Sequence, residues 1–273
     1  MTASWQSKDV PPGGPITPLG WLRLILRALP LGILVFGCLL ILLLVRLIEI
    51  PRYGRRRPWT PHITQFVCRN AFVLMGIAYT TQGQPMAQAG AVVANHSSWL
   101  DIFALNAAQR ITFVAKAEVA GWFGIGWLAR ATGTVFVKRD RKEARNQIAT
   151  FRERLAVGEQ LLFFPEGTST DGLQVLPFKP TLFASFLTPE FAHMAIQPVT
   201  LRYQAGEGQD PRAYGWWGDM DFAPHLLATL AASPQGRVTV VYHPPVQVDD
   251  FTDRKVLAKH LEDQVRAGLI PLL

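Results

Sequence analysis

The feature that most constrains the fold is an uncharged apolar run from Ala28 to Val45, bounded by Arg27 and Arg46. A helix of about 17–25 residues crosses the hydrocarbon core of a bilayer, so the run predicts a membrane helix at the short end of that range. A helix this apolar inside a soluble core would need cover on every side. Pro30 leaves a second interpretation open, in which the segment bends and enters only one leaflet.

Positive charge is concentrated just after this run, where the chain carries Arg46, Arg52, Arg55, Arg56 and Arg57. This bias predicts that the following domain faces the cytoplasm from the inner (cytoplasmic) membrane. The net charge of +7 and the pI near 9.7 indicate an anionic partner. An anionic bilayer surface fits best. A non-enzymatic protein that binds nucleic acid would explain the charge but would leave the apolar run without a role, so no nucleic-acid partner is expected.

The pattern of the chain predicts three parts. Residues 1–20 are rich in Pro and Gly and are expected to be disordered. Residues 21–80 form a membrane-associated helical segment, with a second apolar helix at 60–80. Residues 81–273 form an α/β domain. The two cysteines and the scattered histidines make no metal-ligand pattern, so no metal or resident cofactor is expected.

In the third part, apolar strands alternate with helices. Strands are predicted over 91–94, 111–118, 134–139, 160–166, 193–203 and 237–246, and helices after Asp101 and over 140–158 and 253–269. This alternation is typical of an α/β fold with a largely parallel sheet flanked by helices. In such sheets functional groups gather at the carboxyl ends of the strands.

His96 and Asp101 follow the first of these strands, in the sequence NHSSWLD. On one regular helix they would lie about 140° apart. They meet if His96 lies in the strand-to-helix turn and Asp101 lies one turn inside the helix, with Ser97 or Ser98 as the N-cap. The carboxylate then accepts a hydrogen bond from one imidazole nitrogen, and the other nitrogen can accept a proton. The alternative is a histidine that only caps the helix or fills the core.

Polar groups also follow the other predicted strands. Arg139 could bind a carboxylate or phosphate through two guanidinium nitrogens, or could be a surface charge. Glu166, next to Gly167, could bind an acceptor hydroxyl or orient the loop. Trp216 and Trp217 are expected to pack or to lie near the membrane surface.

Four sequence blocks, in this order over about residues 90–200, resemble the motifs of the glycerolipid acyltransferase family, typified by the 1-acylglycerol-3-phosphate acyltransferases. The blocks are NHSSWLD, GTVFVKR, FFPEGTS and IQPV. The resemblance implies that His96 is a general base and Asp101 its orienting partner. The substrate-binding residues that it implies are Asn95, Gly133, Phe136, Arg139, Glu166, Gly167, Thr168 and Pro198.

One position departs from the family pattern. Members that use glycerophosphates usually carry an arginine after FPEGT, and this chain has Ser169 there. Without that guanidinium a phosphate monoester loses its bidentate partner. FPEGTSTDG followed by VLPFK resembles the branch that acylates lyso-ornithine lipid, whose headgroup is zwitterionic. Asp171 is therefore a candidate to face the ornithine ammonium, although an Asp-Gly pair is also a common turn.

The resemblance implies an O-acyltransferase that moves a fatty acyl group from acyl-ACP or acyl-CoA to the hydroxyl of a membrane lysolipid. Lyso-ornithine lipid is the favoured acceptor and lysophosphatidic acid the alternative. Neither Ser97 nor Ser98 lies in a GxSxG sequence, so no covalent acyl-enzyme is expected. A membrane-anchored lipid or thioester hydrolase remains the rival enzyme class, because it would use a similar His/Asp pair.

Overall fold

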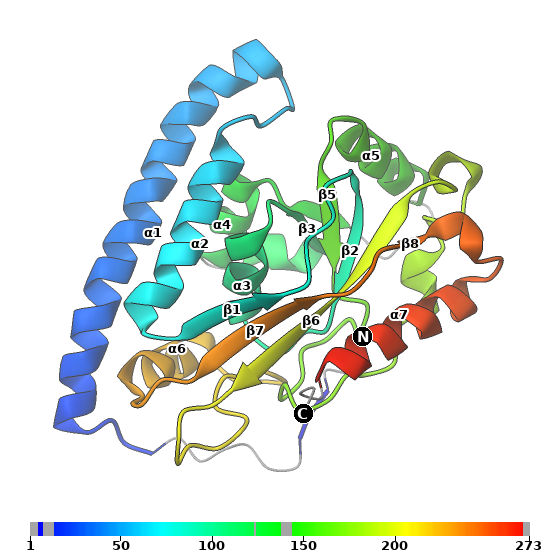
Figure 1. Cartoon of the computed structure of the whole chain (residues 1–273). Coiled ribbons are helices and arrows are strands. Elements are labelled where there is room, and N and C mark those ends of the chain that lie inside the picture. The colour runs from blue at the N-terminus through cyan, green and yellow to red at the C-terminus, as the bar shows by residue number, and fades with distance from the viewer. Residues whose placement is uncertain (1–4, 8–13, 123, 138–143, 270–273) are drawn as a thin grey trace.

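A mixed β-sheet with helices on both faces forms the centre of the computed structural model (Figure 1), which describes residues 5–7, 14–122, 124–137 and 144–269 of the 273-residue chain. The helices are α1 (Pro18–Tyr53), α2 (Thr60–Met75), α3 (Leu100–Ala108), α4 (Ile125–Thr132), α5 (Ala144–Ala156), α6 (Phe222–Ala231) and α7 (Arg254–Leu269). The strands are β1 (Ala78–Gln82), β2 (Gly90–Ala94), β3 (Thr112–Lys116), β4 (Val135–Val137), β5 (Gln160–Phe163), β6 (Ala195–Gln204), β7 (Arg237–Tyr242) and β8 (Val246–Gln247).

The strand order is β1-β7-β6-β2-β5-β3-β4, with β8 beside β6. The five strands from β6 to β4 run parallel, β7 runs antiparallel to β6, and β1 is parallel to β7. The carboxyl ends of β2, β5, β3 and β4 therefore meet at one edge of the sheet. This arrangement confirms the predicted α/β fold with a largely parallel sheet.

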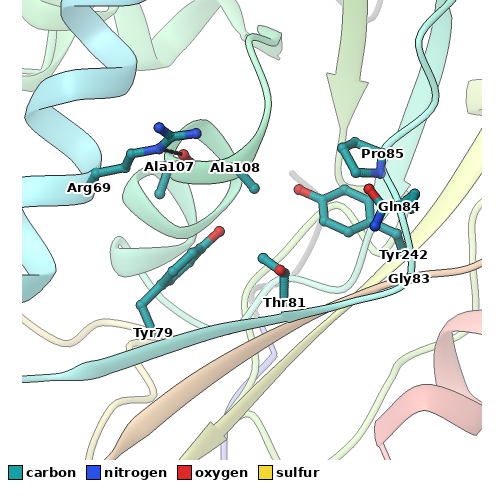
Figure 2. A pocket seen from close by; sticks show the side chains of 9 residues that line it. All are labelled: Arg69, Tyr79, Thr81, Gly83, Gln84, Pro85, Ala107, Ala108 and Tyr242. Atoms are coloured by element: carbon teal, nitrogen blue, oxygen red, sulfur yellow. Dashed lines mark hydrogen bonds between the residues drawn. The ribbon is translucent and has the colours of Figure 1, made fainter.

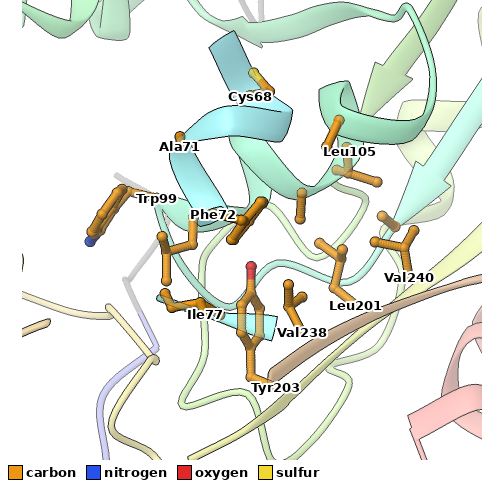
Figure 3. Close-up of a cluster of buried hydrophobic side chains, with 14 of the residues drawn as sticks. Cys68, Ala71, Phe72, Ile77, Trp99, Leu105, Leu201, Tyr203, Val238 and Val240 are labelled. Atoms are coloured by element: carbon orange, nitrogen blue, oxygen red, sulfur yellow. The ribbon is translucent and has the colours of Figure 1, made fainter. Parts of the chain in front are cut away.

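Strand β2 is buried on both faces, which explains its continuous apolar sequence. Val92 and Ala94 belong to a cluster beneath α2 and α3, part of which Figure 3 shows. Ala91 and Val93 belong to a second cluster, to which α5 and α7 contribute. The two-residue period of the strand puts successive side chains into opposite clusters.

Helix α1 is a single helix of 36 residues, about 54 Å long at 1.5 Å per residue. It begins at an N-cap, Thr17, whose Oγ1 accepts the amide of Gly20 at 3.1 Å, and it continues through Pro30 and Pro51. Within the described residues, α1 is the one helix long and apolar enough to cross a bilayer, and only 17% of its most apolar stretch is buried. The large apolar side chains that it exposes include Leu26, Leu29, Ile33, Phe36 and Leu47.

The predicted helix over 60–80 is shorter in the structure. It ends at Met75, because Gly76 adopts a left-handed conformation and caps its carboxyl end. Residues 78–82 then form the edge strand β1, whose partner β7 begins at Arg237. Local apolar periodicity cannot reveal a partner strand so far along the chain. The helix α6 was also not among the elements predicted from that periodicity.

Part of the amino-terminal segment contacts the α/β domain. The ring of Trp5 meets that of Trp217 edge-on, with centroids 6.0 Å apart. Gln6 Nε2 donates to Asp219 Oδ2 at 2.9 Å. The structure therefore differs from the expected disorder over 1–20 at residues 5–7, and also at 18–20, where α1 has already begun.

Candidate active site

His96 and Asp101 are in contact at the carboxyl edge of the sheet. Strand β2 ends at Ala94, and Asp101 lies in the first turn of α3. His96 Nδ1 lies 2.7 Å from Asp101 Oδ2. The carboxylate is fully buried, whereas 24% of the imidazole side chain is exposed. In the part of the chain that the structure describes, His96 Nε2 has no protein hydrogen-bond partner, so it is available to a substrate.

The turn between the two residues is closed by Asp101 itself. Its Oδ2 accepts the backbone amides of Ser97 at 2.8 Å and Ser98 at 3.1 Å. The predicted serine N-cap is wrong: Trp99 occupies that position, and Ser98 Oγ is buried without a partner. A carboxylate in the first turn of a helix satisfies free amides there and interacts favourably with the helix dipole.

The second carboxylate oxygen is bound from the sheet. Tyr203, on β6, donates its hydroxyl to Asp101 Oδ1 at 2.7 Å. The sequence did not reveal this contact, because 102 positions separate the two side chains and Tyr203 lies just beyond the IQPV block.

The imidazole is stacked on an aromatic ring. The centroids of His96 and Phe164 are 4.1 Å apart with an interplanar angle of 13°. Phe164 also stacks with Phe113, with centroids 6.2 Å apart. The backbone oxygen of His96 accepts the amide of Thr170 at 2.9 Å. These contacts fix the plane of the ring and the path of the loop that carries it.

Glu166 orients the loop from inside the protein. Its Oε1 accepts the amide of His96 and its Oε2 accepts the amide of Leu176, each at 2.7 Å. The residue is only 1% exposed. Burial raises the pKa of Glu166 to about 8, with the nearby charge of Asp101 adding to the rise and the two amides opposing it. Of its two predicted roles, this placement matches loop orientation and does not present the carboxylate to a substrate.

Asn95 and Pro198 are built into the sheet. The buried amide of Asn95 bonds both the N–H and the C=O of Leu201, at 2.8 and 2.9 Å, and so extends the pairing of β2 with β6. Pro198 pairs with Val93 in the middle of the sheet. It lies where neither β7 nor β8 pairs with β6, so its missing N–H breaks no ladder bond on that side.

Gly133 makes room for an arginine that sequence analysis did not single out as a site residue. Gly133 ends α4 with φ +92°, and a Cβ there would lie 2.5 Å from Arg57 Nη1. Arg57 also donates to the C=O of Ala131 at 3.1 Å, and burial with Arg46 nearby lowers its pKa to about 10. The α1–α2 connection is thereby attached to the carboxyl end of α4.

Two other predicted residues are Phe136 and Arg139. Phe136 is half-buried in the edge strand β4, three strands away from β2 in the sheet order. Arg139 lies outside the described residues, and its predicted contact with an acceptor stays a prediction.

The loop after β5 carries the remaining predicted residues. Gly167 forms a turn with φ +73°. Thr168 Oγ1 accepts the amide of Trp5 at 3.3 Å. Asp171 Oδ1 accepts the amide of Leu173 at 3.1 Å, which is the turn contact expected of an Asp-Gly pair. Ser169 and Asp171 are both half-buried.

Comparison with known proteins places these blocks in a family. Residues 78–202 match the family model described as Acyltransferase. The chain is 54% identical, over 97% of its length and 96% of the relative's, to a lyso-ornithine lipid O-acyltransferase of Rhodobacter capsulatus. The chain belongs to the acyltransferase family. The predicted family is confirmed.

Two other known proteins are also similar to this acyltransferase. It is 32% identical to a 1-acyl-sn-glycerol-3-phosphate acyltransferase of Neisseria gonorrhoeae, over 64% of this chain and 68% of that protein. The crystal structure of the 1-acyl-sn-glycerophosphate acyltransferase PlsC of Thermotoga maritima has the same fold. Its TM-score is 0.63 with 21% sequence identity, over 92% of this chain and 94% of that one.

A cleft of about 290 Å³ lies at the other end of α3 (Figure 2). It is lined by Ala107 and Ala108, by Tyr79 on β1 and by Tyr242 on β7. None of the residues that line it is a predicted site residue. The helix of the acyltransferase that carries Asp101 at its amino end thus borders a separate hollow at its carboxyl end.

Proposed function

We propose that this acyltransferase moves a fatty acyl group from an acyl-ACP or acyl-CoA thioester to the free hydroxyl of lyso-ornithine lipid. The contact between His96 Nδ1 and Asp101 Oδ2 carries the chemical part of the proposal. The 54% identity with a lyso-ornithine lipid O-acyltransferase over nearly the full length of both chains supports the acceptor.

Asp101 holds the proton on Nδ1, so Nε2 accepts the proton of the acceptor hydroxyl. The hydroxyl oxygen attacks the thioester carbonyl and forms a tetrahedral intermediate. As the C–S bond breaks, the imidazolium returns its proton to the leaving thiolate. The free enzyme is restored without a covalent acyl-enzyme. The complete burial of Ser97 and Ser98 supports this direct transfer.

Two residues in the loop after β5 support the proposal that the acceptor has a zwitterionic headgroup. Ser169 stands where a phosphate-binding arginine would be, and the half-buried Asp171 adds a negative charge two residues later. One oxygen of Asp171 accepts the amide of Leu173, and the other is proposed to face the ornithine ammonium. The half-buried Asp171 carboxylate attracts an ammonium and repels a phosphate, so it favours an acceptor whose headgroup carries an ammonium.

Membrane attachment brings the site to its acceptor. The exposed apolar face of α1 supports insertion into the bilayer. The exposed Arg52, Arg55 and Arg56 support binding to anionic headgroups, each contributing about 1 kcal/mol near the surface. The proposed location is the inner membrane with the catalytic domain in the cytoplasm.

One assay with purified protein tests the proposal. Lyso-ornithine lipid and lysophosphatidic acid are offered separately, each with labelled acyl-CoA and with labelled acyl-ACP. Formation of ornithine lipid is expected with at least one donor. Equal or faster conversion of lysophosphatidic acid would overturn the acceptor assignment. Release of free fatty acid without a diacylated product would indicate a hydrolase.

A substitution in the loop tests the headgroup argument. Ser169→Arg supplies the missing guanidinium and should shift the ratio of rates toward lysophosphatidic acid. Thr181→Arg, at an exposed position outside the loop, adds the same charge and should leave that ratio unchanged. The same shift in both variants would mean that added charge, and not the position of Ser169, controls the preference.

A further inference from the structure

We infer that Tyr203 is a positioning residue for the His96–Asp101 pair: its hydroxyl binds Asp101 Oδ1 and so keeps Oδ2 on the imidazole. The inference rests on the proposed role of this pair in acyl transfer. The contact is 2.7 Å long. Tyr203 belongs to the hydrophobic cluster of Figure 3, where its ring rises from β6 toward the helical layer.

The two oxygens of Asp101 have different partners. Oδ2 accepts three hydrogen bonds, from His96 Nδ1 and from the amides of Ser97 and Ser98. Oδ1 accepts the Tyr203 hydroxyl, its one hydrogen-bond donor within the described structure. Because the carboxylate is fully buried, water does not replace a lost donor there. An unpaired buried carboxylate oxygen is costly, so the Tyr203 hydroxyl stabilises the orientation of the whole group.

The sheet fixes the position of the Tyr203 hydroxyl. Strand β6 continues past the end of β2, and Asn95 attaches it to the catalytic loop through both backbone groups of Leu201. Alternation along β6 then puts Leu201 and Tyr203 on the face beneath α2 and α3. The donor therefore belongs to the rigid sheet, whereas the acceptor belongs to the first turn of a helix.

The hydroxyl remains a donor over the working pH range. Burial and the neighbouring Asp101 charge hold the pKa of Tyr203 well above its ordinary value. In donating to Oδ1 it draws negative charge away from Oδ2. Without it, both the charge on Oδ2 and the contact of Oδ2 with the imidazole change.

Tyr203→Phe removes only the hydroxyl and tests the inference. We expect kcat to fall about 10-fold with KM for both substrates unchanged, because the defect lies in proton transfer and not in binding. The acidic limb of the kcat/KM profile should shift by about half a unit or more. Loss of packing alone would not move that limb.

Tyr79→Phe is the matched control. Tyr79 lies on the same face and donates to α3 as well, but to the backbone oxygen of Ala104 at 3.0 Å. The Tyr79→Phe protein should lose about as much thermal stability as the Tyr203→Phe protein, but the acidic limb of its kcat/KM profile should not shift. A Tyr203→Phe protein with a wild-type kcat and pH profile, or the same shift in both variants, would overturn the inference. His96→Ala separates the two claims: an active His96→Ala protein would refute the proposed role of His96 as the base, on which this inference rests.

Discussion

His96 Nδ1 lies 2.7 Å from Asp101 Oδ2, and the same oxygen accepts the amides of the two serines between them. One carboxylate therefore performs two tasks: it starts α3 and it orients the imidazole. Any change that displaces Asp101 should affect both the helix start and the chemistry.

Replacing His96 by Ala should lower acyl transfer by about 10²–10⁴-fold, the usual contribution of a general base. The protein should still sediment with membranes, because α1 is unchanged. His193→Ala is the matched control, since the side chain of His193 is 93% exposed and pairs with Asp249 on the surface. Initial rates at saturating substrate measure the effect. Substantial activity in His96→Ala would refute the base assignment.

Glu166 should make stability depend on pH. Burial raises its pKa from 4.5 to about 8, so the folded protein keeps this proton where the unfolded chain releases it. The contribution is complete below about pH 4.5 and is lost as the pH rises through about 8. Glu166→Gln, neutral throughout, should flatten this slope, which is at most about 1.4 kcal/mol per pH unit.

Urea unfolding of both proteins in detergent between pH 5 and pH 9 measures this difference. Glu190→Gln is the control, because its side chain is 45% exposed and pairs with Arg152 at the surface. The same decline with pH in the wild-type and Glu166→Gln proteins would contradict the raised pKa.

Gly133→Ala should destabilise the fold by about 1–3 kcal/mol, because its φ of +92° is unfavourable for alanine and the new Cβ meets Arg57. Gly121→Ala is the control, since its Cβ would meet nothing within 4 Å. Thermal unfolding measures the cost. Lost activity with unchanged stability would instead favour the acceptor-binding role that the family resemblance implies.

Lysines on the exposed face of α1 should release the protein from membranes. Ile33 and Phe36 are 67% and 65% exposed, and a lysine at bilayer depth costs about 2.5–3.5 kcal/mol. Val256→Lys on α7, at a residue that is 58% exposed, is the control away from α1. Flotation with vesicles containing anionic lipid measures the bound fraction. Unchanged flotation of the Ile33→Lys/Phe36→Lys protein would refute insertion through this face.

The sequence determined the features that depend on neighbouring residues. The apolar run from Ala28 to Val45 requires a long helix with an exposed apolar face, and such a helix is present. Alternating strands and helices predicted the parallel sheet, and the ordered motif blocks indicated the family. His96 and Asp101 meet across the strand-to-helix turn after Ala94. The sequence could predict this contact because the two residues are only five positions apart.

Tertiary structure alone decided what surrounds that pair. Tyr203 reaches Asp101 only because β6 lies beside β2 and extends beyond it. Glu166 points inward because its carboxylate meets the amides of His96 and Leu176. Such contacts join residues that are distant in sequence, and their partners depend on strand order and burial. Hydrophobic periodicity records which face of an element is buried, but it does not record which element covers that face.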